Sequence, residues 1–283
     1  GYYFAQAPGR LRGGDVVFPH VTVMGTEHAL LAATLADGHT TIRPAAQEPE
    51  IDDLIVLLQA MGAEVERTAP DVIEVEGRRR LRGATHHTIA DRIEAGTFAV
   101  AAAITGGDVT LRGAPSEHLG AFLSVLHEVG VDVSAHGEWI TVRGAEAGSD
   151  IYRAADIETA AYPGLATDLQ PPTGVLLTQA RGTSTVHESI YEDRLEWLTD
   201  LGAMGAKAEI RDAHHAVITG PARLQGAEVE VGDLRAGASL ILGALAAQGR
   251  STIHGVHHVR RGYEGIEDKL LDLGAGIDPE PEA

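Results

Sequence analysis

The sequence has no cysteine and few aromatic residues, and both features restrict what the protein can be. Because none of its 283 residues is cysteine, disulfide bonds, thiolate metal ligands and a cysteine nucleophile are excluded within this chain. Aromatic residues make up only 4% of the chain, whereas hydrophobic residues make up 44%. The core must therefore be built from alanine, valine, leucine and isoleucine, a composition that suits helices packed closely through small side chains.

Basic residues are also scarce. The chain has 22 lysines and arginines against 41 aspartates and glutamates, which gives a formal net charge of −19 at pH 7. A surface of this sign repels nucleic acids and anionic membranes, so we expect neither as a partner. The sequence shows no apolar run of transmembrane length and no signal peptide, and we expect the protein in the cytoplasm.

A repeated pattern runs through the chain. Each copy has an apolar segment of small residues, a glycine turn, a β-branched strand and then an amphipathic segment, and in the first three copies two more strands follow. The amphipathic segments end at Gly62, Gly130, Gly205 and Gly274. Glycine is the usual residue after the end of a helix, so the pattern predicts four such helices.

With the lead-in strands that precede several copies, the order of elements is β-α-β-α-β-β, which indicates an α/β (α+β) protein. The alternating strands predict sheets with one solvated face, and the small-residue helices should be buried. The fourth copy ends near Asp278 without its last two strands. We expect those strands to come from a segment before Gly1, since the chain begins without methionine.

Several motifs occur in order with this repeat, and together they resemble the enolpyruvyl transferases. They are residues 48–51, 91–98, 162–170, 233–236, 261–264 and 266–270. The resemblance implies two domains, each an inside-out α/β barrel of three units with helices inside, of which this chain holds about four units. It assigns residues 1–89 to the last unit of the first, loop-bearing domain and 90–283 to the second domain, with an N-terminal third missing.

The resemblance also implies a reaction. Members of the family move the enolpyruvyl group of phosphoenolpyruvate onto a hydroxyl group, without a cofactor. The match favours the 3-hydroxyl of UDP-N-acetylglucosamine as acceptor, which is the first committed step of peptidoglycan precursor synthesis. A sugar hydroxyl needs a carboxylate to take its proton, and Asp168 matches the family's base. From its position alone, after the turn at Tyr162-Pro163-Gly164, Asp168 would more readily be a helix cap.

Phosphoenolpyruvate is a small polyanion, and its carboxylate suits the forked donors of arginine. Arg235 and Arg261 match the family's carboxylate-binding arginines, and Arg194 matches a third active-site arginine. For Arg194 alone, a surface ion pair is nearly as good an interpretation. In a chain so rich in acidic residues, a few well-placed arginines must provide the binding of anions.

The resemblance points to six residues for the UDP-sugar: Thr22, Val23, Met24, Thr167, Asp168 and Ile190. The first three replace a Ser-Val-Gly turn of the family. Met24 adds a side chain where the family has glycine, unless Gly25 takes over that role.

Four acidic residues are possible parts of the cleft: Glu48, Glu50, Asp91 and Asp233. We also expect Asp91, Glu94 and Asp233 to cap helices. The histidine pairs 86–87, 214–215 and 257–258 lack partners at metal-ligand spacing, so no metal site is predicted.

Three alternatives stay open. The acceptor could be shikimate 3-phosphate, although the arginine and Tyr-Pro-Gly motifs fit those enzymes less well, or another uridine nucleotide, as Met24 and Pro171-Pro172 suggest. The chain could also be a noncatalytic module that binds nucleotide sugars. The family's flexible acid-bearing loop and its phosphate-binding lysine and arginine have no counterpart here, so we expect this chain alone to be inactive.

Overall fold

The chain divides into two compact units. A computed structural model describes residues 2, 4–7, 9–146 and 151–278. Unit 1 comprises residues 1–89 with 161–163, and unit 2 comprises residues 90–160 with 164–283. No helix within the described ranges has the length and apolar character needed to cross a bilayer.

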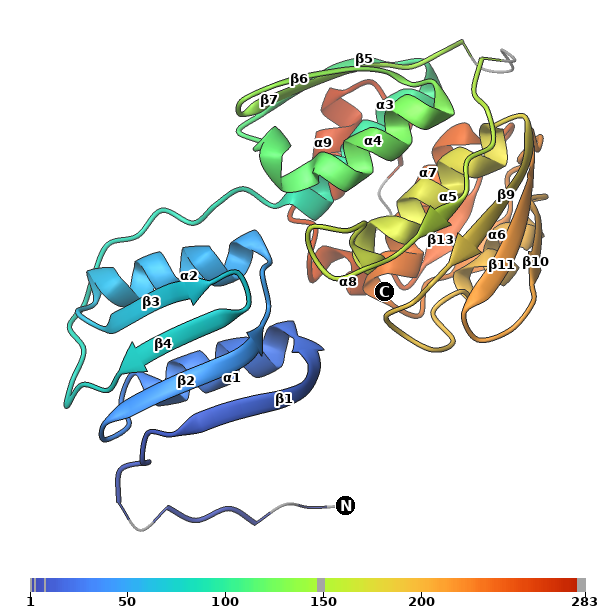
Figure 1. Cartoon of the computed structure of the whole chain (residues 1–283). Coiled ribbons are helices and arrows are strands. Elements are labelled where there is room, and N and C mark those ends of the chain that lie inside the picture. The colour runs from blue at the N-terminus through green and yellow to red at the C-terminus, as the bar shows by residue number, and fades with distance from the viewer. Residues whose placement is uncertain (1, 3, 8, 147–150, 279–283) are drawn as a thin grey trace. The chain divides into compact units, whose positions relative to one another are not determined.

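Unit 1 is a single β-α-β-α-β-β repeat, as the sequence pattern predicts. Its elements are β1 (Asp15–Thr22), α1 (Val23–Ala33), β2 (His39–Ala45), α2 (Pro49–Ala60), β3 (Glu64–Ala69) and β4 (Val72–Glu76). The sheet has the order β1-β2-β4-β3, in which β1 and β2 are parallel and β4 is antiparallel to both of its neighbours. Helix α1 forms the crossover that two parallel strands require (Figure 1).

Alternating side chains explain why each sheet has only one covered face. In β4, Ile73 and Val75 are completely buried, while the glutamates next to them lie on the more exposed face. In the β7 strand of unit 2 (Trp139–Arg143), Ile140 and Val142 are buried in the same way. Successive side chains of a strand point to opposite faces, so this period of two directs one face of each sheet to the core.

Unit 2 contains three further copies of the repeat. The first holds α3 (Arg92–Thr105), β5 (Asp108–Arg112), the 3-10 turn η1 (Ser116–Leu119), α4 (Gly120–Val129), β6 (Asp132–His136) and β7. The second holds β8 (Ile157–Glu158), the 3-10 turn η2 (Thr167–Leu169), α5 (Gln170–Gln179), β9 (Gly182–His187), α6 (Trp197–Ala203), β10 (Lys207–Ile210) and β11 (His215–Gly220). The third holds β12 (Glu228–Glu230), α7 (Leu234–Ala246), β13 (Thr252–His254), α8 (His257–Arg260) and α9 (Ile266–Asp272).

The sheets of unit 2 repeat the pattern of unit 1 with losses. The order β8-β9-β11-β10 reproduces β1-β2-β4-β3, including the parallel first pair. The first copy forms a three-stranded sheet, β5-β7-β6, and the third forms only the parallel pair β12-β13. Up to residue 278, where the described part of the chain ends, no strand follows β13.

The four predicted glycine stops are confirmed. Gly62, Gly130, Gly205 and Gly274 follow α2, α4, α6 and α9, and their φ angles lie between +94° and +96°. Residues with a β-carbon rarely adopt this left-handed conformation, which explains why glycine recurs at this point of every copy.

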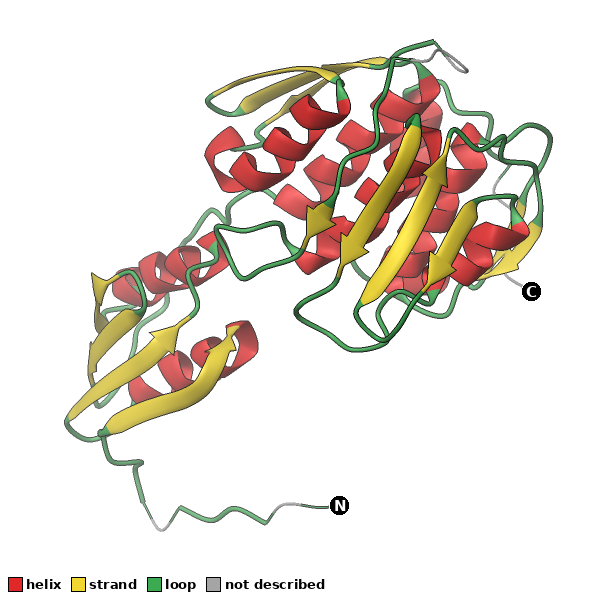
Figure 2. Ribbon diagram, turned by 45° about the vertical axis from the view of Figure 1, so that its right-hand side comes forward, coloured by secondary structure: helices red, strands yellow, loops and turns green. Residues whose placement is uncertain are grey.

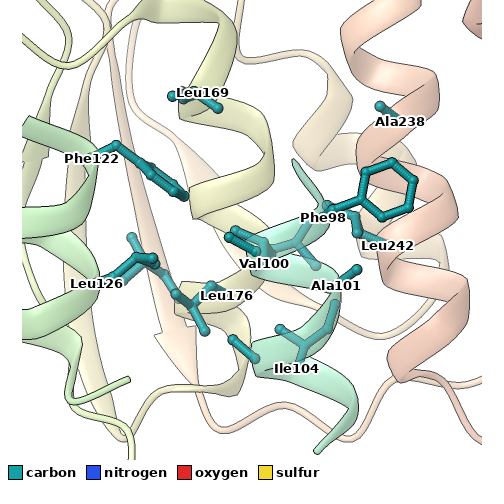
Figure 3. Packing of buried hydrophobic residues seen from close by; sticks show 14 of the residues in the cluster. Phe98, Val100, Ala101, Ile104, Phe122, Leu126, Leu169, Leu176, Ala238 and Leu242 are labelled. Carbon is teal, nitrogen blue, oxygen red and sulfur yellow. The ribbon is translucent and has the colours of Figure 1, made fainter. Parts of the chain in front are cut away.

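Helices α3, α5 and α7 lie at the centre of unit 2, and the strands surround them (Figure 2). Figure 3 shows Phe98 and Ala101 of α3 beside Ala238 and Leu242 of α7. Nearly every residue of α3 and α5 is buried, because each helix packs against neighbours on several sides. The small side chains that the composition predicts for the core let these helices approach one another closely.

Gly174 of α5 allows such a close approach, and it generates a stability prediction. A β-carbon at this position would lie 2.5 Å from Cη2 of Trp197, so we expect Gly174→Ala to lower the free energy of unfolding by about 1–3 kcal/mol. Gly202→Ala in α6 is the control, because its β-carbon would meet nothing within 4 Å and should add about 0.5–1 kcal/mol. Both tryptophans, Trp139 and Trp197, lie in unit 2, so tryptophan fluorescence during urea unfolding reports on this unit. If both substitutions change the free energy of unfolding equally, Gly174 does not pack closely against Trp197.

Candidate active site

Asp168 lies in the turn η2, directly before helix α5, and it does not cap that helix. Its carboxylate accepts two hydrogen bonds from arginines. Nη2 of Arg194 lies 2.5 Å from Oδ1, and Nη2 of Arg235 lies 2.7 Å from Oδ2. The structure therefore brings together Asp168, Arg194 and Arg235, three residues that are far apart in the sequence.

The charge of Asp168 is set by two opposing effects. Its side chain is 32% exposed, and burial pushes the pKa of the carboxyl upward. The positive charges of Arg235 and Arg194, together with their hydrogen bonds, outweigh burial and hold the pKa of Asp168 below its ordinary value. Asp168 is therefore ionised at neutral pH and is already paired with cations.

Arg235 is fixed from several directions. It is the second residue of α7, and the N-cap residue Asp233 accepts its backbone N–H at 2.8 Å. Its Nη1 donates to the hydroxyl of Tyr263 at 3.1 Å, and its guanidinium carbon lies 5.6 Å from the centre of the Tyr263 ring. A guanidinium group held on both edges and over a ring has little freedom to turn, so its remaining donors point in a defined direction.

Tyr263 connects this arginine to the core. It is completely buried, and its hydroxyl lies 2.9 Å from Oγ1 of Thr97 in α3. Because Thr97 donates its own proton to the carbonyl of Ile93, Tyr263 must donate to Thr97 and accept from Arg235. Burial raises the pKa of Tyr263 despite the nearby arginine, which keeps the donating hydroxyl protonated.

Two buried residues, Tyr263 beside Arg235 and Glu188 beside Thr167, were not predicted as site residues from the sequence. Tyr263 lies within the 261–264 motif that carries the family resemblance, so the motif was a usable signal. Glu188 gave no signal, but its buried carboxylate accepts the hydroxyl of Thr167, the residue next to Asp168, at 2.8 Å. Arg194 forms an ion pair with Asp168, and its side chain is 25% exposed; that it binds phosphoenolpyruvate stays a prediction.

Arg261 is not part of the hydrogen-bonded cluster. It is exposed as the residue after α8, where its backbone N–H donates to the carbonyl of Val259, and its side chain makes no hydrogen bond or ion pair with any residue that the structure describes. That Arg261 binds a substrate carboxylate stays a prediction.

The residues predicted for the UDP-sugar belong to both units. Thr22 caps α1 by accepting the N–H of Gly25 at 3.2 Å, and Met24, which is 63% exposed, lies in the first turn. A β-carbon on Gly25 would lie 2.3 Å from Cγ2 of Thr22, so this cap requires a glycine there. Ile190 in unit 2 is 40% exposed. That Thr22–Met24, Thr167 and Ile190 bind one ligand also stays a prediction.

The predicted helix caps are confirmed at Asp91 and Asp233, each of which accepts two backbone N–H groups at the start of its helix. Glu94 was wrongly predicted to be a cap. Its carboxylate instead pairs with Lys269 of α9, which is close only in the folded chain.

Glu48 and Glu50 belong to the start of α2 in unit 1. Oε1 of Glu48 accepts the N–H of Tyr162 at 3.5 Å, and Oε2 is buried with no hydrogen-bond partner in the described part of the chain. Among the described residues, no group of three or more histidine, aspartate or glutamate side chains is placed to hold a metal ion.

Comparison with known proteins gives the family. The sequence profile of the EPSP synthase (3-phosphoshikimate 1-carboxyvinyltransferase) family matches residues 3–270. The UDP-N-acetylglucosamine 1-carboxyvinyltransferase of Solibacter usitatus is 49% identical over 277 residues, which is 98% of this chain and 65% of that protein. The protein of the same name from Methylocella silvestris is 46% identical over 278 residues, which is 98% of this chain and 64% of that protein. The chain thus spans just under two thirds of the length of these relatives.

A solved structure agrees with this assignment. The enolpyruvyl transferase NikO from Streptomyces tendae matches the fold with a TM-score of 0.81 at 27% identity, over 89% of this chain and 59% of that chain. The resemblance seen in the sequence motifs is confirmed by profile, relatives and fold together. The chain belongs to the EPSP synthase family of enolpyruvyl transferases.

Proposed function

We propose that this chain is part of an enzyme that transfers the enolpyruvyl group of phosphoenolpyruvate to the 3-hydroxyl of UDP-N-acetylglucosamine. Relatives that are 44–49% identical carry the name of that activity. The observation that carries the proposal is the carboxylate of Asp168 held at 2.5 and 2.7 Å by two guanidinium groups. This arrangement combines a proton acceptor with donors for a small carboxylate ligand.

In this mechanism Asp168 accepts the proton of the sugar hydroxyl as its oxygen attacks C2 of phosphoenolpyruvate. The methylene carbon of phosphoenolpyruvate gains a proton in the same addition, and a tetrahedral adduct forms. The resemblance implies that this proton comes from the family's acid-bearing loop, which has no counterpart in these 283 residues. That carbon then loses a proton as the C–O bond to phosphate breaks, and the enolpyruvyl ether and inorganic phosphate are released. The protein's part in the first step is to hold the acceptor oxygen within hydrogen-bonding reach of Asp168.

Asp168 and the substrate carboxylate compete for the same donors. In the structure, Arg235 donates to Asp168 at 2.7 Å. A phosphoenolpyruvate carboxylate that takes over this guanidinium removes a stabilising partner from Asp168, and the pKa of Asp168 then rises. Binding of the anion thus strengthens the base that the reaction needs.

The proposal extends to the organisation and the cellular role of the protein. Residues 1–89 form the last unit of a first domain, and residues 90–283 belong to a second domain. Arg261 joins Arg235 and Arg194 in binding phosphoenolpyruvate, while Thr22–Met24, Thr167 and Ile190 contact the UDP-sugar. The reaction would serve peptidoglycan precursor synthesis in the cytoplasm.

The choice of acceptor can be tested by calorimetry with the 283-residue chain at pH 7. We expect UDP-N-acetylglucosamine to bind and shikimate 3-phosphate to leave that binding unchanged, because the relatives with high identity carry the name of the former activity. Release of phosphate from phosphoenolpyruvate should be followed with each acceptor in parallel. If shikimate 3-phosphate binds or supports phosphate release and UDP-N-acetylglucosamine does neither, the proposed acceptor is wrong.

Competition between Asp168 and the ligand predicts an unusual effect of mutation. Asp168→Asn should tighten phosphoenolpyruvate binding on the order of tenfold, because the charged competitor for the arginines is gone. Arg235→Ala should weaken binding on the order of tenfold or more, because a charge-assisted donor is lost.

The control for this calorimetry is Asp108→Asn. It removes one negative charge from an exposed ion pair with Arg143 and should leave the dissociation constant unchanged. If Asp168→Asn leaves the dissociation constant unchanged, as the control should, or weakens binding, then phosphoenolpyruvate does not compete with Asp168 for the arginines.

The lowered pKa of Asp168 also predicts a dependence of stability on pH. A carboxyl whose pKa is lower in the folded than in the unfolded chain stabilises the fold above its unfolded pKa of about 3.9, and this contribution disappears as the pH falls through the folded value. The gap in unfolding midpoint between wild type and Asp168→Asn should therefore be constant from about pH 7 to pH 5 and shrink below about pH 4. Thermal unfolding followed by tryptophan fluorescence measures it. A gap that stays constant down to about pH 3 would contradict the ion pairs.

A further inference from the structure

Glu188 is a buried carboxylate that the proposed chemistry does not use. It follows strand β9 directly, and its residue surface is 0% exposed. Burying a carboxylate costs free energy unless hydrogen bonds replace the lost water. Glu188 has such replacements on both oxygens, so its position is closely defined.

Four donors converge on this carboxylate. Oε1 accepts from Oγ1 of Thr159 at 2.9 Å, from the N–H of Ile190 at 3.0 Å and from the N–H of Tyr191 at 3.2 Å. Oε2 accepts from Oγ1 of Thr167 at 2.8 Å. Charge-assisted hydrogen bonds of this kind are stronger than those between neutral groups.

The backbone of Glu188 is fixed as well. Its N–H donates to the carbonyl of His214 at 2.7 Å, and its own carbonyl lies 2.7 Å from Nδ1 of His214. Because a carbonyl only accepts, Nδ1 of His214 carries the proton. Glu188 is therefore held at its main chain by His214, the residue before β11, and at its side chain by three other segments.

Those segments lead to the candidate active site. Thr167 is next to Asp168 in the chain. Tyr191 lies under Arg194, whose guanidinium carbon is 5.0 Å from the centre of the tyrosine ring. Thr159 lies just after β8 and donates to Oε1, whereas Thr167 donates to the other oxygen of the carboxylate, Oε2. One carboxylate thus joins the turn that carries Asp168 to the loop that leads to Arg194.

We propose that Glu188 is a positioning residue, which holds the Thr167–Asp168 turn and the Ile190–Tyr191 loop so that Asp168 and Arg194 meet. The proposal deepens the proposed function, since Asp168 is the base of that reaction. An apolar side chain could fill the same volume, but it could not bind donors from three segments at once. The hydrogen bond from Thr167 is the only one of the four that reaches the residue beside Asp168, so it should transmit the effect.

The test compares two isosteric substitutions on the same carboxylate. Thr167→Val removes the hydrogen bond to Oε2 of Glu188, on the Asp168 side. Thr159→Val removes a hydrogen bond to Oε1, and it also removes the acceptor of the Ser189 N–H at 2.9 Å. Two readouts are needed: the thermal midpoint by tryptophan fluorescence, and the pKa of Asp168 by carbon-13 NMR of labelled aspartate carboxyls, assigned with Asp168→Asn. We expect both substitutions to lower the midpoint, since each leaves a buried acceptor with one donor fewer.

Only Thr167→Val should move the pKa of Asp168, upward toward the ordinary aspartate value, because the carboxylate then meets its arginines less well. Thr167→Ser restores the hydroxyl and should restore the wild-type pKa, and Thr167→Ala is the second variant if valine is not accommodated. An unchanged pKa in both Thr167→Val and Thr167→Ala, or an equal shift in Thr159→Val, would overturn the positioning role and leave Glu188 with a structural one.

Neither readout requires phosphoenolpyruvate or turnover, so the two proposals can fail separately. If the wild-type chain does not bind phosphoenolpyruvate while Thr167→Val still shifts the pKa of Asp168, the proposed function falls and the positioning role stands. If the wild-type chain binds phosphoenolpyruvate and Thr167→Val leaves the pKa of Asp168 unchanged, the positioning role falls and the proposed function stands.

Discussion

Two arginines meet on one carboxylate, that of Asp168, at 2.5 and 2.7 Å. The three charged groups leave an excess of one positive charge, in a chain whose formal net charge is −19. This local excess can attract a small anion where the mean charge of the protein cannot. The same pairs keep Asp168 ionised, as its proposed role as a proton acceptor requires.

The fold supplies this arrangement through the helices at the centre of unit 2. Asp168 lies in the turn η2, which directly precedes α5, and Arg235 lies in the first turn of α7, so the two ion-pair partners stand at the starts of two central helices. Tyr263 ties Arg235 to Thr97 of α3 through hydrogen bonds of 3.1 and 2.9 Å. Glu188 likewise holds the turn before α5, by accepting the hydroxyl of Thr167 at 2.8 Å. Buried polar contacts from separate copies of the repeat therefore fix the site.

Local patterns made most of the fold predictable. The glycine after each amphipathic helix and the alternation in strands such as β4 depend only on neighbours in the chain, and the caps Asp91 and Asp233 also act within their own first turn. Contacts between distant segments could not be read in this way. Glu94 was mistaken for a cap because its partner is 175 positions away. The role of Glu188 requires donors from three segments, and that of Asp168 was suggested by family resemblance rather than by spacing.

The most direct measurement is a crystal structure of this chain with phosphoenolpyruvate at neutral pH. If phosphoenolpyruvate replaces Asp168 as the partner of Arg235, the guanidinium of Arg235 should bind the carboxylate of the ligand. Asp168 should then lie beyond hydrogen-bonding distance from Arg235, with its carboxylate free to accept a proton from the sugar hydroxyl. A ligand bound elsewhere, with the 2.7 Å contact between Arg235 and Asp168 intact, would contradict it.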